Sequence, residues 1–385
     1  MRICMLAPSH PSWDPRVVHR EAASLVKLGH TVAVVAMHDP SRPAPENILL
    51  LSLPQVQLTR WRRFKRLWMT YGLGRSWPAD VYHAHEVESL LIGILLKWRT
   101  GAKLVFDAHE CFHFTAARFS KGRMAKVITW LTARGLRWMS RRANHVIVVS
   151  FTNEQFYRDY CGCRKVTIIH NSPPILGVPY KDKPEEARWT LTHDGFLDCG
   201  RGMLQMLEAL ALVRREMPAR LLVVGQVHQH ELPLFSRRIQ ELGIQDAITV
   251  TGWVPYAEVT ALLNRGSIGL VAMQPTPNNY GSLSNKLFNY MATGQAVIGP
   301  KGSDTEVVLQ RAHCGVVAEM TNAELLAKAM LELLSNPERT KTLGLNGRRA
   351  VEDEYGWHKM EQLLEEIYAG LGGGGEKRVL KPGQG

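Results

Sequence analysis

Residues 2–37 decide the fold, and they read RICMLAPSHPSWDPRVVHREAASLVKLGHTVAVVAM. The apolar run at residues 2–6 predicts a strand, and residues 31–37 predict a second one. Between them, residues 14–27 carry apolar side chains at helical spacing, namely Val17, Val18, Ala22 and Leu25. Strand, helix and strand in this order predict a parallel βαβ unit, in which the helix connects two neighbouring strands of one sheet.

The same plan continues and then starts again in the second half of the chain. Further strands are expected in the first half at residues 81–83, 103–107, 146–149 and 167–169. The second half opens with a strand at 189–193 and a helix at 202–214, followed by strands at 220–224, 248–251, 268–271, 296–298 and 315–317. This alternation predicts two Rossmann-like, doubly wound α/β domains facing across a cleft, with functional loops at the carboxyl ends of their strands.

The expected boundaries follow from this plan and from a chain length of 385 residues, which suits two domains of ordinary size. We expect an N-terminal domain over residues 1–175 and a C-terminal domain over 176–355, joined by a proline-rich hinge. A terminal helix at 356–371 is expected to pack back toward the N-terminal domain. The glycine-rich residues 372–385 are expected to form a flexible tail.

Composition and charge narrow the possible partners. The chain is 45% hydrophobic and 21% charged, without a run of about 20 apolar residues or an opening signal peptide, so we expect it to fold in the cytosol with reduced cysteines. Residues 1–175 hold 25 Lys and Arg against 11 Asp and Glu, whereas the remainder is nearly neutral. An anionic partner is therefore expected for the first half alone: a membrane surface, a nucleic acid or a phosphorylated substrate.

Several cofactor classes are disfavoured by missing motifs. No G-x-G-x-x-G follows the first strand and no G-x-x-x-x-G-K-[ST] occurs, which argues against ordinary dehydrogenases and P-loop NTPases. No D-x-D pair is present to chelate a metal diphosphate, so no metal and no cofactor are expected. His83 and His85 with Glu86 suggest a metal site, but a third ligand is not evident, and a polar strand end is the favoured interpretation.

The most specific segment is residues 280–298, YGSLSNKLFNYMATGQAVI. It resembles the donor-binding end of a retaining two-domain GT-B glycosyltransferase of glycosyltransferase family 4. Other family-like pieces occur in the right order: D-P-R-V from Asp14, H-A-H-E from His83, F-D-A-H-E from Phe106, I-H-N-S from Ile169, G-R-G from Gly200 and Y-G-W from Tyr355. The resemblance covers about residues 1–370 and implies a nucleotide-sugar donor.

The resemblance assigns the donor site to the second half. It implies that Arg201, followed by Gly202, and Lys286, beside Ser284 and Asn285, hold the diphosphate of the donor at two helix starts. The alternative is that these cations are solvated helix-start residues. The family also places two glutamates eight positions apart, for the donor sugar and for the ribose, and this chain has Gly281 and Asn289 there. Neither residue carries a charge, which puts both glutamate roles in doubt.

On the acceptor side, the resemblance implies that His109 contacts the donor sugar, with Glu110 beside it orienting the site or accepting a proton. The alternative is a strand-end His and Glu satisfied by neighbouring backbone. Trp13, Asp14 and Arg16 follow the first strand, where an acceptor would enter. Asp14 is also suited to cap the helix that follows, with Pro15 in its first turn.

Two basic and aromatic stretches stand out in the first half. The run from Arg60 to Trp68 alternates cations with aromatics, and the segment from Arg118 to Arg142 adds further cations among Trp130, Leu131 and Trp138. Such a composition suits the headgroup region of an anionic bilayer. It would also suit a nucleic-acid backbone, although no nucleic-acid module is present, and the membrane is favoured. The remaining alternative is that Trp130, Leu131 and Trp138 are core residues beside a solvated basic face.

Together these features predict a metal-independent, retaining glycosyltransferase at the inner face of the cell membrane. Its acceptor is expected to be lipid-linked or a saccharide, in cell-envelope or exopolysaccharide and glycoconjugate synthesis, and no nucleic acid is expected as a partner. Two alternatives remain open. The first is a catalytically weakened relative that acts as a binding or scaffolding partner of another transferase, suggested by Gly281 and Asn289. The second is a nucleic-acid binder.

Overall fold

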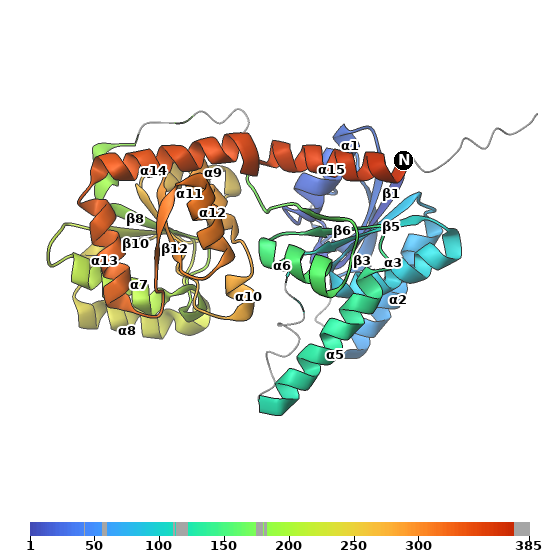
Figure 1. Ribbon diagram of the computed structural model, residues 1–385, viewed down its shortest axis with the longest axis horizontal. Coiled ribbons are helices and arrows are strands. Elements are labelled where there is room, and N and C mark those ends of the chain that lie inside the picture. The colour runs from blue at the N-terminus through green and yellow to red at the C-terminus, as the bar shows by residue number, and fades with distance from the viewer. Residues whose placement is uncertain are drawn as a thin grey trace, which may run out of the picture. The chain divides into compact units, whose positions relative to one another are not determined.

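The structure is a computed structural model, drawn in Figure 1. It describes residues 1–41, 43–55, 60–110, 112, 122–174, 180 and 183–372, with backbone alone at 60–62 and 256. The chain divides into two compact units. Unit 1 comprises Met1–Val149, Asn153–Ile169 and Met360–Gly385, and unit 2 comprises Ser150–Thr152 and His170–Lys359.

Unit 1 contains a seven-stranded sheet in the order β3-β2-β1-β4-β5-β6-β7, and all of its pairings are parallel. Its strands are β1 (Arg2–Pro11), β2 (Thr31–His38), β3 (Leu49–Pro54), β4 (Val81–His85), β5 (Lys103–Ala108), β6 (His145–Val148) and β7 (Val166–Ile168). The six strands that the sequence predicts in this half are confirmed, with ends shifted by up to five residues. The edge strand β3 was missed.

Helices surround this sheet (Figure 1). They are η1 (Val17–Ala22), α1 (Ala23–Lys27), α2 (Arg60–Ser76), α3 (Glu86–Thr100), α5 (Gly122–Ser140) and η2 (Phe156–Tyr160), while α6 (Phe151–Gln155) spans the boundary of the two units. The first helix was predicted to begin at residue 14, but it begins at Val17. Asp14 lies before the helix and accepts a hydrogen bond from the Val17 backbone N–H, and the first turns, η1, have π-helical hydrogen bonding. The central strands are buried on both faces, as expected of an all-parallel sheet covered by helices.

Unit 2 contains a six-stranded sheet in the order β10-β9-β8-β11-β12-β13, again with parallel pairings. The strands are β8 (Thr190–Asp194), β9 (Arg220–Val224), β10 (Ile248–Val250), β11 (Ile268–Leu270), β12 (Ala296–Pro300) and β13 (Gly315–Ala318). All six were predicted. The two Rossmann-like α/β units therefore confirm the expected fold class.

The helices of unit 2 are η3 (Glu185–Trp189), η4 (Cys199–Arg201), α7 (Met203–Val213), η5 (Gln229–Glu231), α8 (Leu232–Leu242), η6 (Gln245–Ala247), α9 (Tyr256–Leu263), α10 (Pro277–Tyr280), α11 (Asn285–Ala292), α12 (Asp304–Ala312), α13 (Ala323–Leu334), α14 (Pro337–Ala350) and η7 (Val351–Tyr355). Their apolar faces cover the sheet. Leu207 and Leu210 of α7 and Leu326 and Met330 of α13 belong to one core cluster, which also includes the strand residue Leu191.

The last helix, α15 (Trp357–Gly372), returns the chain to unit 1 from Met360 onward. Its buried Tyr368 hydroxyl lies 2.9 Å from Nδ1 of His83 in β4, and Nζ of Lys27 in α1 donates to Glu361 at 2.8 Å. The end of the chain therefore completes the packing of the unit with which the chain begins.

Strand order locates the place for a ligand in each sheet. The order reverses beside β1 and β4 in unit 1, and beside β8 and β11 in unit 2. In open parallel sheets, ligands bind beyond the carboxyl ends of the strands at such a reversal. The side chains that follow β1, β4, β8 and β11 are therefore the first to consider.

Candidate functional site

The turn that precedes α7 in unit 2 is shaped by Gly202. Its φ is +79°, and a Cβ atom there would lie 2.3 Å from the carbonyl oxygen of Ala272, so only glycine fits without backbone movement. Oδ1 of Asp198 accepts from the Arg201 backbone N–H at 2.8 Å, and Oδ2 ion-pairs with the Arg201 guanidinium. This cap fixes Arg201 immediately before the N-terminus of α7.

Lys286 lies in the first turn of α11, where Ser284 is the N-cap and Asn285 the first residue. Its side chain is buried. Burial, together with the charge of Arg201, lowers the pKa of Lys286 to about 8, although Asp194 and Asp198 act in the opposite direction. Because Arg201 and Lys286 repel each other and Lys286 is poorly hydrated, an anion at this place would stabilise both cations.

A carboxylate stands beside the residue that occupies the second glutamate position. Asp194 ends β8, and its Oδ2 accepts from Nδ2 of Asn289 at 2.7 Å. The Asp194 backbone N–H donates to the Tyr290 hydroxyl at 2.7 Å. Burial raises the pKa of Asp194, partly offset by Asn289 and Lys286. Asp194 was not among the residues predicted from the sequence, although its place at the end of a strand at the sheet reversal could have indicated it.

The first glutamate position is closed to a larger side chain. A Cβ atom on Gly281 would lie 2.9 Å from Cγ2 of Thr152 and 3.0 Å from the carbonyl oxygen of Pro277. The Gly281 carbonyl oxygen also accepts from the Ser150 hydroxyl at 2.7 Å. Gly281 is thus a packing position in this structure, and it offers backbone groups alone.

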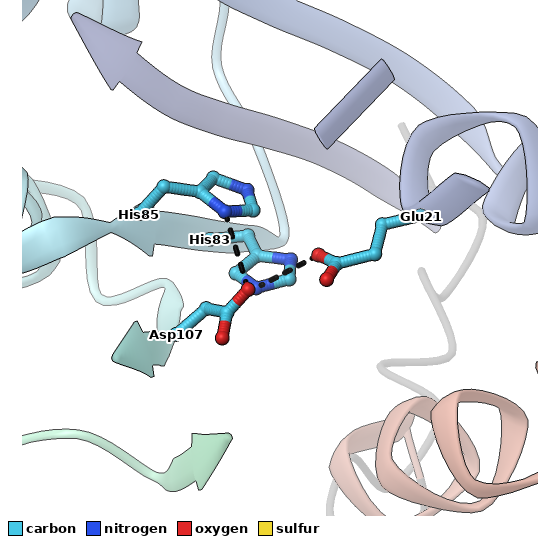
Figure 2. A group of neighbouring side chains, drawn as sticks. All are labelled: Glu21, His83, His85 and Asp107. Atoms are coloured by element: carbon cyan, nitrogen blue, oxygen red, sulfur yellow. Dashed lines mark ion pairs between the residues drawn. The ribbon is translucent and has the colours of Figure 1, made fainter. Parts of the chain in front are cut away.

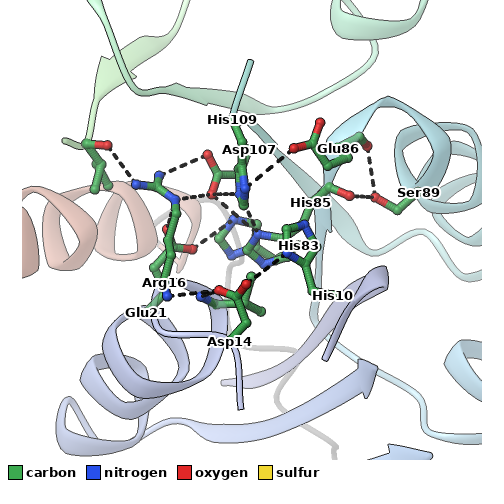
Figure 3. Close-up of polar contacts among 12 residues, drawn as sticks. His10, Asp14, Arg16, Glu21, His83, His85, Glu86, Ser89, Asp107 and His109 are labelled. Atoms are coloured by element: carbon green, nitrogen blue, oxygen red, sulfur yellow. Dashed lines mark hydrogen bonds and ion pairs between the residues drawn. The ribbon is translucent and has the colours of Figure 1, made fainter. Parts of the chain in front are cut away.

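In unit 1, three polar side chains come from the carboxyl ends of neighbouring strands: His10 from β1, Glu86 after β4 and His109 after β5 (Figure 3). Nε2 of His109 lies 2.9 Å from Oδ2 of Asp107, and its Nδ1 lies 3.6 Å from Oε1 of Glu86. Burial lowers the pKa of His109, but Asp107 and Glu86 outweigh this effect and raise it to about 9. The ring is therefore an imidazolium held between two carboxyl groups at neutral pH.

Glu86 was not among the predicted site residues. Its φ of +69° is in the left-handed region, which is uncommon for residues other than glycine and recurs at functional sites. Burial raises the pKa of Glu86, and the positive charges of His109 and His10 lower it. Glu110, by contrast, is exposed, and its charge also contributes to the raised pKa of Glu86.

A buried ionic layer lies behind these residues and includes Arg16 (Figure 3). The Arg16 guanidinium lies 3.1 Å from Oδ1 of Asp107 and 2.9 Å from Oε1 of Glu21, and it donates to the Ile169 carbonyl at 3.0 Å. Only 5% of Arg16 is exposed. Its burial among these partners does not fit the expectation that Arg16 meets an entering acceptor, and its role here is to neutralise buried carboxylates.

Asp14 has the capping role that its sequence context allowed. Its Oδ1 accepts from the backbone N–H groups of Arg16 and Val17, each at 2.9 Å, and its Oδ2 lies 3.1 Å from Nδ1 of His10. Burial raises the pKa of Asp14, but the bonds to His10 and Val17 outweigh it, so the carboxyl stays ionised. Trp13 beside it is half-buried.

His83 and His85 are stacked, with ring centroids 4.4 Å apart, and they lie beside two buried carboxyl groups (Figure 2). Glu21, His83, His85 and Asp107 each offer one ligand atom, all within 4.8 Å of one another. The further ligands that the sequence did not show are thus present. Arg16 already pairs with both carboxylates, however, so a cationic group occupies this layer.

The aromatic residues of α5 are exposed, so the alternative that they are core is wrong. The exposed fractions are 54% for Trp130, 55% for Leu131 and 48% for Trp138. One end of α5 extends away from the rest of unit 1 (Figure 1), and only Ala133, Leu136 and Ser140 of this helix are buried. Residues 118–121 and the side chains of residues 60–62 lie outside the described residues, whereas Phe64 and Trp68 of α2 are exposed.

A hollow of about 550 Å³ lies at the C-terminal end of α5. It is lined by four arginines and two aromatic residues, namely Arg134, Arg137, Arg141, Arg142, Trp138 and Tyr160. Arg142 stacks on Trp138, with its guanidinium carbon 3.6 Å from the ring centroid. Within the described part of the chain, no helix has both the length and the apolar character needed to span a bilayer.

Comparison with known proteins identifies the family of this chain. The family model described as Glycosyltransferase Family 4 matches residues 15–172, and the one described as Glycosyl transferases group 1 matches residues 195–336. The chain belongs to glycosyltransferase family 4. Among curated relatives of this family 4 chain, glycogen synthase of Mycobacterium tuberculosis is 20% identical over 96% of this chain and 94% of that protein. D-inositol 3-phosphate glycosyltransferase of Segniliparus rotundus is 24% identical over 78% and 68%.

Solved structures agree on the GT-B fold of this family 4 glycosyltransferase. Sucrose-phosphate synthase from Thermosynechococcus elongatus matches with a TM-score of 0.76 at 17% identity, covering 96% of this chain and 99% of that one. HepE of Anabaena, solved in complex with UDP, matches with a TM-score of 0.72 at 15% identity, covering 96% and 100%. At such identities the likeness concerns the fold alone.

Proposed function

We propose that this glycosyltransferase binds a nucleoside-diphosphate sugar in unit 2 and transfers the sugar, with retention, to a saccharide or lipid-linked acceptor. The observation that carries the proposal is the pair Arg201 and Lys286, two cations at the starts of helices on the reversal side of one sheet. Helix N-terminal amides and cations together suit a diphosphate. They also stabilise the charge of the leaving nucleoside diphosphate, so the proposal needs no metal at the phosphates.

The ribose contact in this proposal involves Asp194 together with Asn289. The amide of Asn289 donates to Asp194, and the free acceptor capacity of that carboxylate can receive bonds from a ribose diol. The negative charge that the family places at position 289 would then be supplied by Asp194 at the end of β8. UDP is the first nucleotide to test, because HepE, which shares the fold, was solved with UDP and with UDP-glucose.

His109 remains the proposed sugar-contacting residue of unit 1, with Glu110 next to it in sequence. As an imidazolium it can stabilise negative charge but cannot accept a proton at neutral pH. Because Gly281 offers no carboxylate, charge stabilisation at the sugar has to come from other groups. In this proposal, the reaction with the acceptor therefore depends on side chains of unit 1.

The acceptor is proposed to lie at an anionic membrane, on the inner face of the cell membrane. Support comes from the exposed aromatic residues of α5 and from the four-arginine hollow at its end. Aromatic side chains suit the headgroup boundary, and arginines bind phosphate in a bidentate manner. A lipid-linked acceptor would be delivered at this surface.

Thermal shift with nucleotides tests the donor proposal. UDP, and in parallel GDP, ADP and TDP, would be added to the purified full chain, and one of them should raise its melting temperature. Lys286→Ala and Arg201→Ala should abolish this rise, whereas Lys301→Ala, at an exposed lysine of the same unit, should keep it. An unchanged rise in both site variants would contradict the assignment.

The catalytically weakened relative remains the second candidate, because Gly281 and Asn289 replace both glutamates. It shares the donor-binding result but predicts neither hydrolysis of the sugar donor nor transfer. Incubation with the donor identified by thermal shift, followed by chromatography of the released nucleoside diphosphate, separates the two. Measurable release by the wild type that Lys286→Ala abolishes would eliminate the scaffold role.

A further inference from the structure

A cavity of about 480 Å³ lies in unit 2 at the amino ends of three strands. Its wall includes Arg188, two residues before β8, Ser267, directly before β11, and Gly294, two residues before β12. Lys286, by contrast, interacts with Asp194 at the carboxyl end of β8. Because parallel strands begin at one edge of a sheet and end at the other, the cavity is separate from the diphosphate cations. Its volume is typical of a small-molecule site.

Lys183 contributes to this cavity an amino group that lacks a partner. Its Nζ atom is buried and has no hydrogen-bond partner among the described residues. Burial lowers the pKa of Lys183 to about 7. A buried polar group without a hydrogen bond is destabilising, so a fold that keeps one in a cavity is expected to satisfy it with a ligand. An anion would do this best, because it favours the charged form of the amine.

The first turn of α14 also lines the cavity, through Pro337 and Glu338. The side chain of Asn336 accepts from the Arg339 backbone N–H at 3.1 Å, and the Asn336 carbonyl accepts from the Thr340 N–H at 3.0 Å. Proline has no N–H, which leaves the Glu338 N–H without an acceptor among the described residues. A free amide at the positive end of a helix is a second donor suited to an anion.

The charged side chains of the wall are arranged with a cation on the inside. Arg188 and Lys341 are exposed cations, and Glu185 and Glu338 are exposed carboxylates. Exposed carboxylates can turn toward water, whereas the buried Nζ of Lys183 cannot. The inner end of the cavity therefore favours an anion, and the two exposed cations are long enough to reach toward one.

The remaining wall is largely apolar. Leu333 and Leu334 of α13 are buried beneath the cavity, and Pro184 and Tyr180 add further apolar surface. The Tyr180 ring packs on the backbone of Gly294, where a Cβ atom would lie 2.6 Å from Cε2 of the ring. This wall suits the organic part of a ligand whose anionic group is bound at the inner end.

We propose that this cavity binds a small phosphate monoester, with the phosphate at Lys183 and the organic part against the apolar wall. A phosphate has three terminal oxygens that accept hydrogen bonds, which matches three kinds of donor: the Lys183 amine, the Glu338 N–H and the exposed cations. A carboxylate has only two oxygens. The helix α11, which carries Lys286 in its first turn, ends two residues before Gly294. A ligand in the cavity would therefore lie at the far end of the helix that holds a donor cation.

Calorimetric titration of the full chain with phenyl phosphate tests the proposal without any sugar donor. The Lys286→Ala chain is used throughout, so that phosphate binding at the donor cations does not contribute. We expect one site per chain. Adding Lys183→Met, which removes the amine and keeps the aliphatic chain, should lower the affinity by at least about tenfold. Adding Lys341→Ala should lower it about two- to fivefold, and adding Lys301→Ala, at an exposed lysine that does not line the cavity, should leave it unchanged.

The pH dependence of binding identifies Lys183 specifically. With a pKa of about 7, Lys183 is about half protonated at pH 7 and almost entirely neutral at pH 9. Phenyl phosphate is a dianion at both pH values. Binding should therefore be at least about tenfold weaker at pH 9, and at pH 7 it should take up about half a proton, measured from the heats in buffers of different ionisation enthalpy. Lys183→Met should lose both effects.

Phenol, which has the same ring without the phosphate, should bind at least about tenfold more weakly than phenyl phosphate. Circular dichroism melting shows which variants are folded. The proposal is overturned if the Lys286→Ala chain binds no phenyl phosphate, if folded Lys183→Met binds it equally well, or if phenol binds as tightly. If Lys183→Met does not fold, unchanged affinity in Lys341→Ala together with equal affinity at pH 7 and pH 9 overturns it.

Discussion

Replacing Lys286 by methionine should stabilise the free protein and abolish nucleotide binding at the same time. The ammonium is buried, and burial with repulsion from Arg201 lowers its pKa from 10.5 to about 8. At about 1.4 kcal/mol per pH unit, this corresponds to a cost of about 3 kcal/mol for keeping the ammonium charged where it is buried. Methionine keeps most of the aliphatic chain and removes the charge.

The expected gain in melting temperature is about 6–12 °C, since about 1 kcal/mol corresponds to about 2–4 °C in a unit of this size. Differential scanning calorimetry at pH 7 measures it, with Lys301→Met as the exposed control that should leave the melting temperature unchanged. The same scans with UDP should show stabilisation of the wild type alone. A gain in stability that accompanies a loss of binding is the usual relation at a functional site.

The effect has a definite pH dependence. The folded protein releases the Lys286 proton near pH 8, whereas the unfolded chain keeps it to pH 10.5, so wild-type stability increases with pH in this window. The advantage of Lys286→Met should therefore be complete at pH 7 and fall by about half or more at pH 9.5. A lower melting temperature in Lys286→Met, or an equal difference at both pH values, would refute the account of Lys286 as a strained cation.

Three further outcomes follow from the structure. Gly202→Ala should cost more than 2 kcal/mol in urea unfolding, because its Cβ would lie 2.3 Å from a carbonyl oxygen, whereas Gly243→Ala, at a positive φ in open space, should cost about 1 kcal/mol. Tyr368→Phe should lower the free energy of unfolding by about 1–2 kcal/mol, since it leaves a buried imidazole nitrogen without its partner, and equal stability would exclude that bond. Arg134→Glu with Arg137→Glu should abolish flotation with anionic vesicles while UDP binding persists; retained flotation would place the membrane contact elsewhere.

The strands of both sheets could be predicted because they are short apolar runs bounded by turn residues, and burial on both faces makes this pattern strong. β3 (Leu49–Pro54) escaped because an edge strand is half exposed and follows a proline-rich stretch. The position of Arg201 and Lys286 at helix starts was predictable from spacing and from family-like motifs. The lowered pKa of Lys286 was not, because it depends on the depth at which the fold buries the ammonium.

Asp194 and Glu86 show what sequence reasoning cannot reach without a sheet order. Asp194 contacts Asn289, which lies 95 residues later in the sequence. Glu86, which follows β4, contacts His109, which follows β5. The left-handed backbone conformation of Glu86 is not indicated by any residue pattern. The burial of Arg16 was unforeseen for the same reason, since its partners Asp107 and Ile169 are distant in sequence. Such contacts follow from which strands are neighbours.

The return of α15 to unit 1 has a consequence for the order in which the protein is made. Tyr368 meets His83 across 285 positions, so the ribosome synthesises all of unit 2 before the last helix of unit 1 exists. Unit 2 can complete its own packing first, while the part of β4 that α15 will cover is still exposed in the nascent unit 1. A gene truncated after residue 359 would leave that face permanently bare, and chaperone dependence and aggregation would then report on unit 1 rather than on unit 2, which keeps all of its residues.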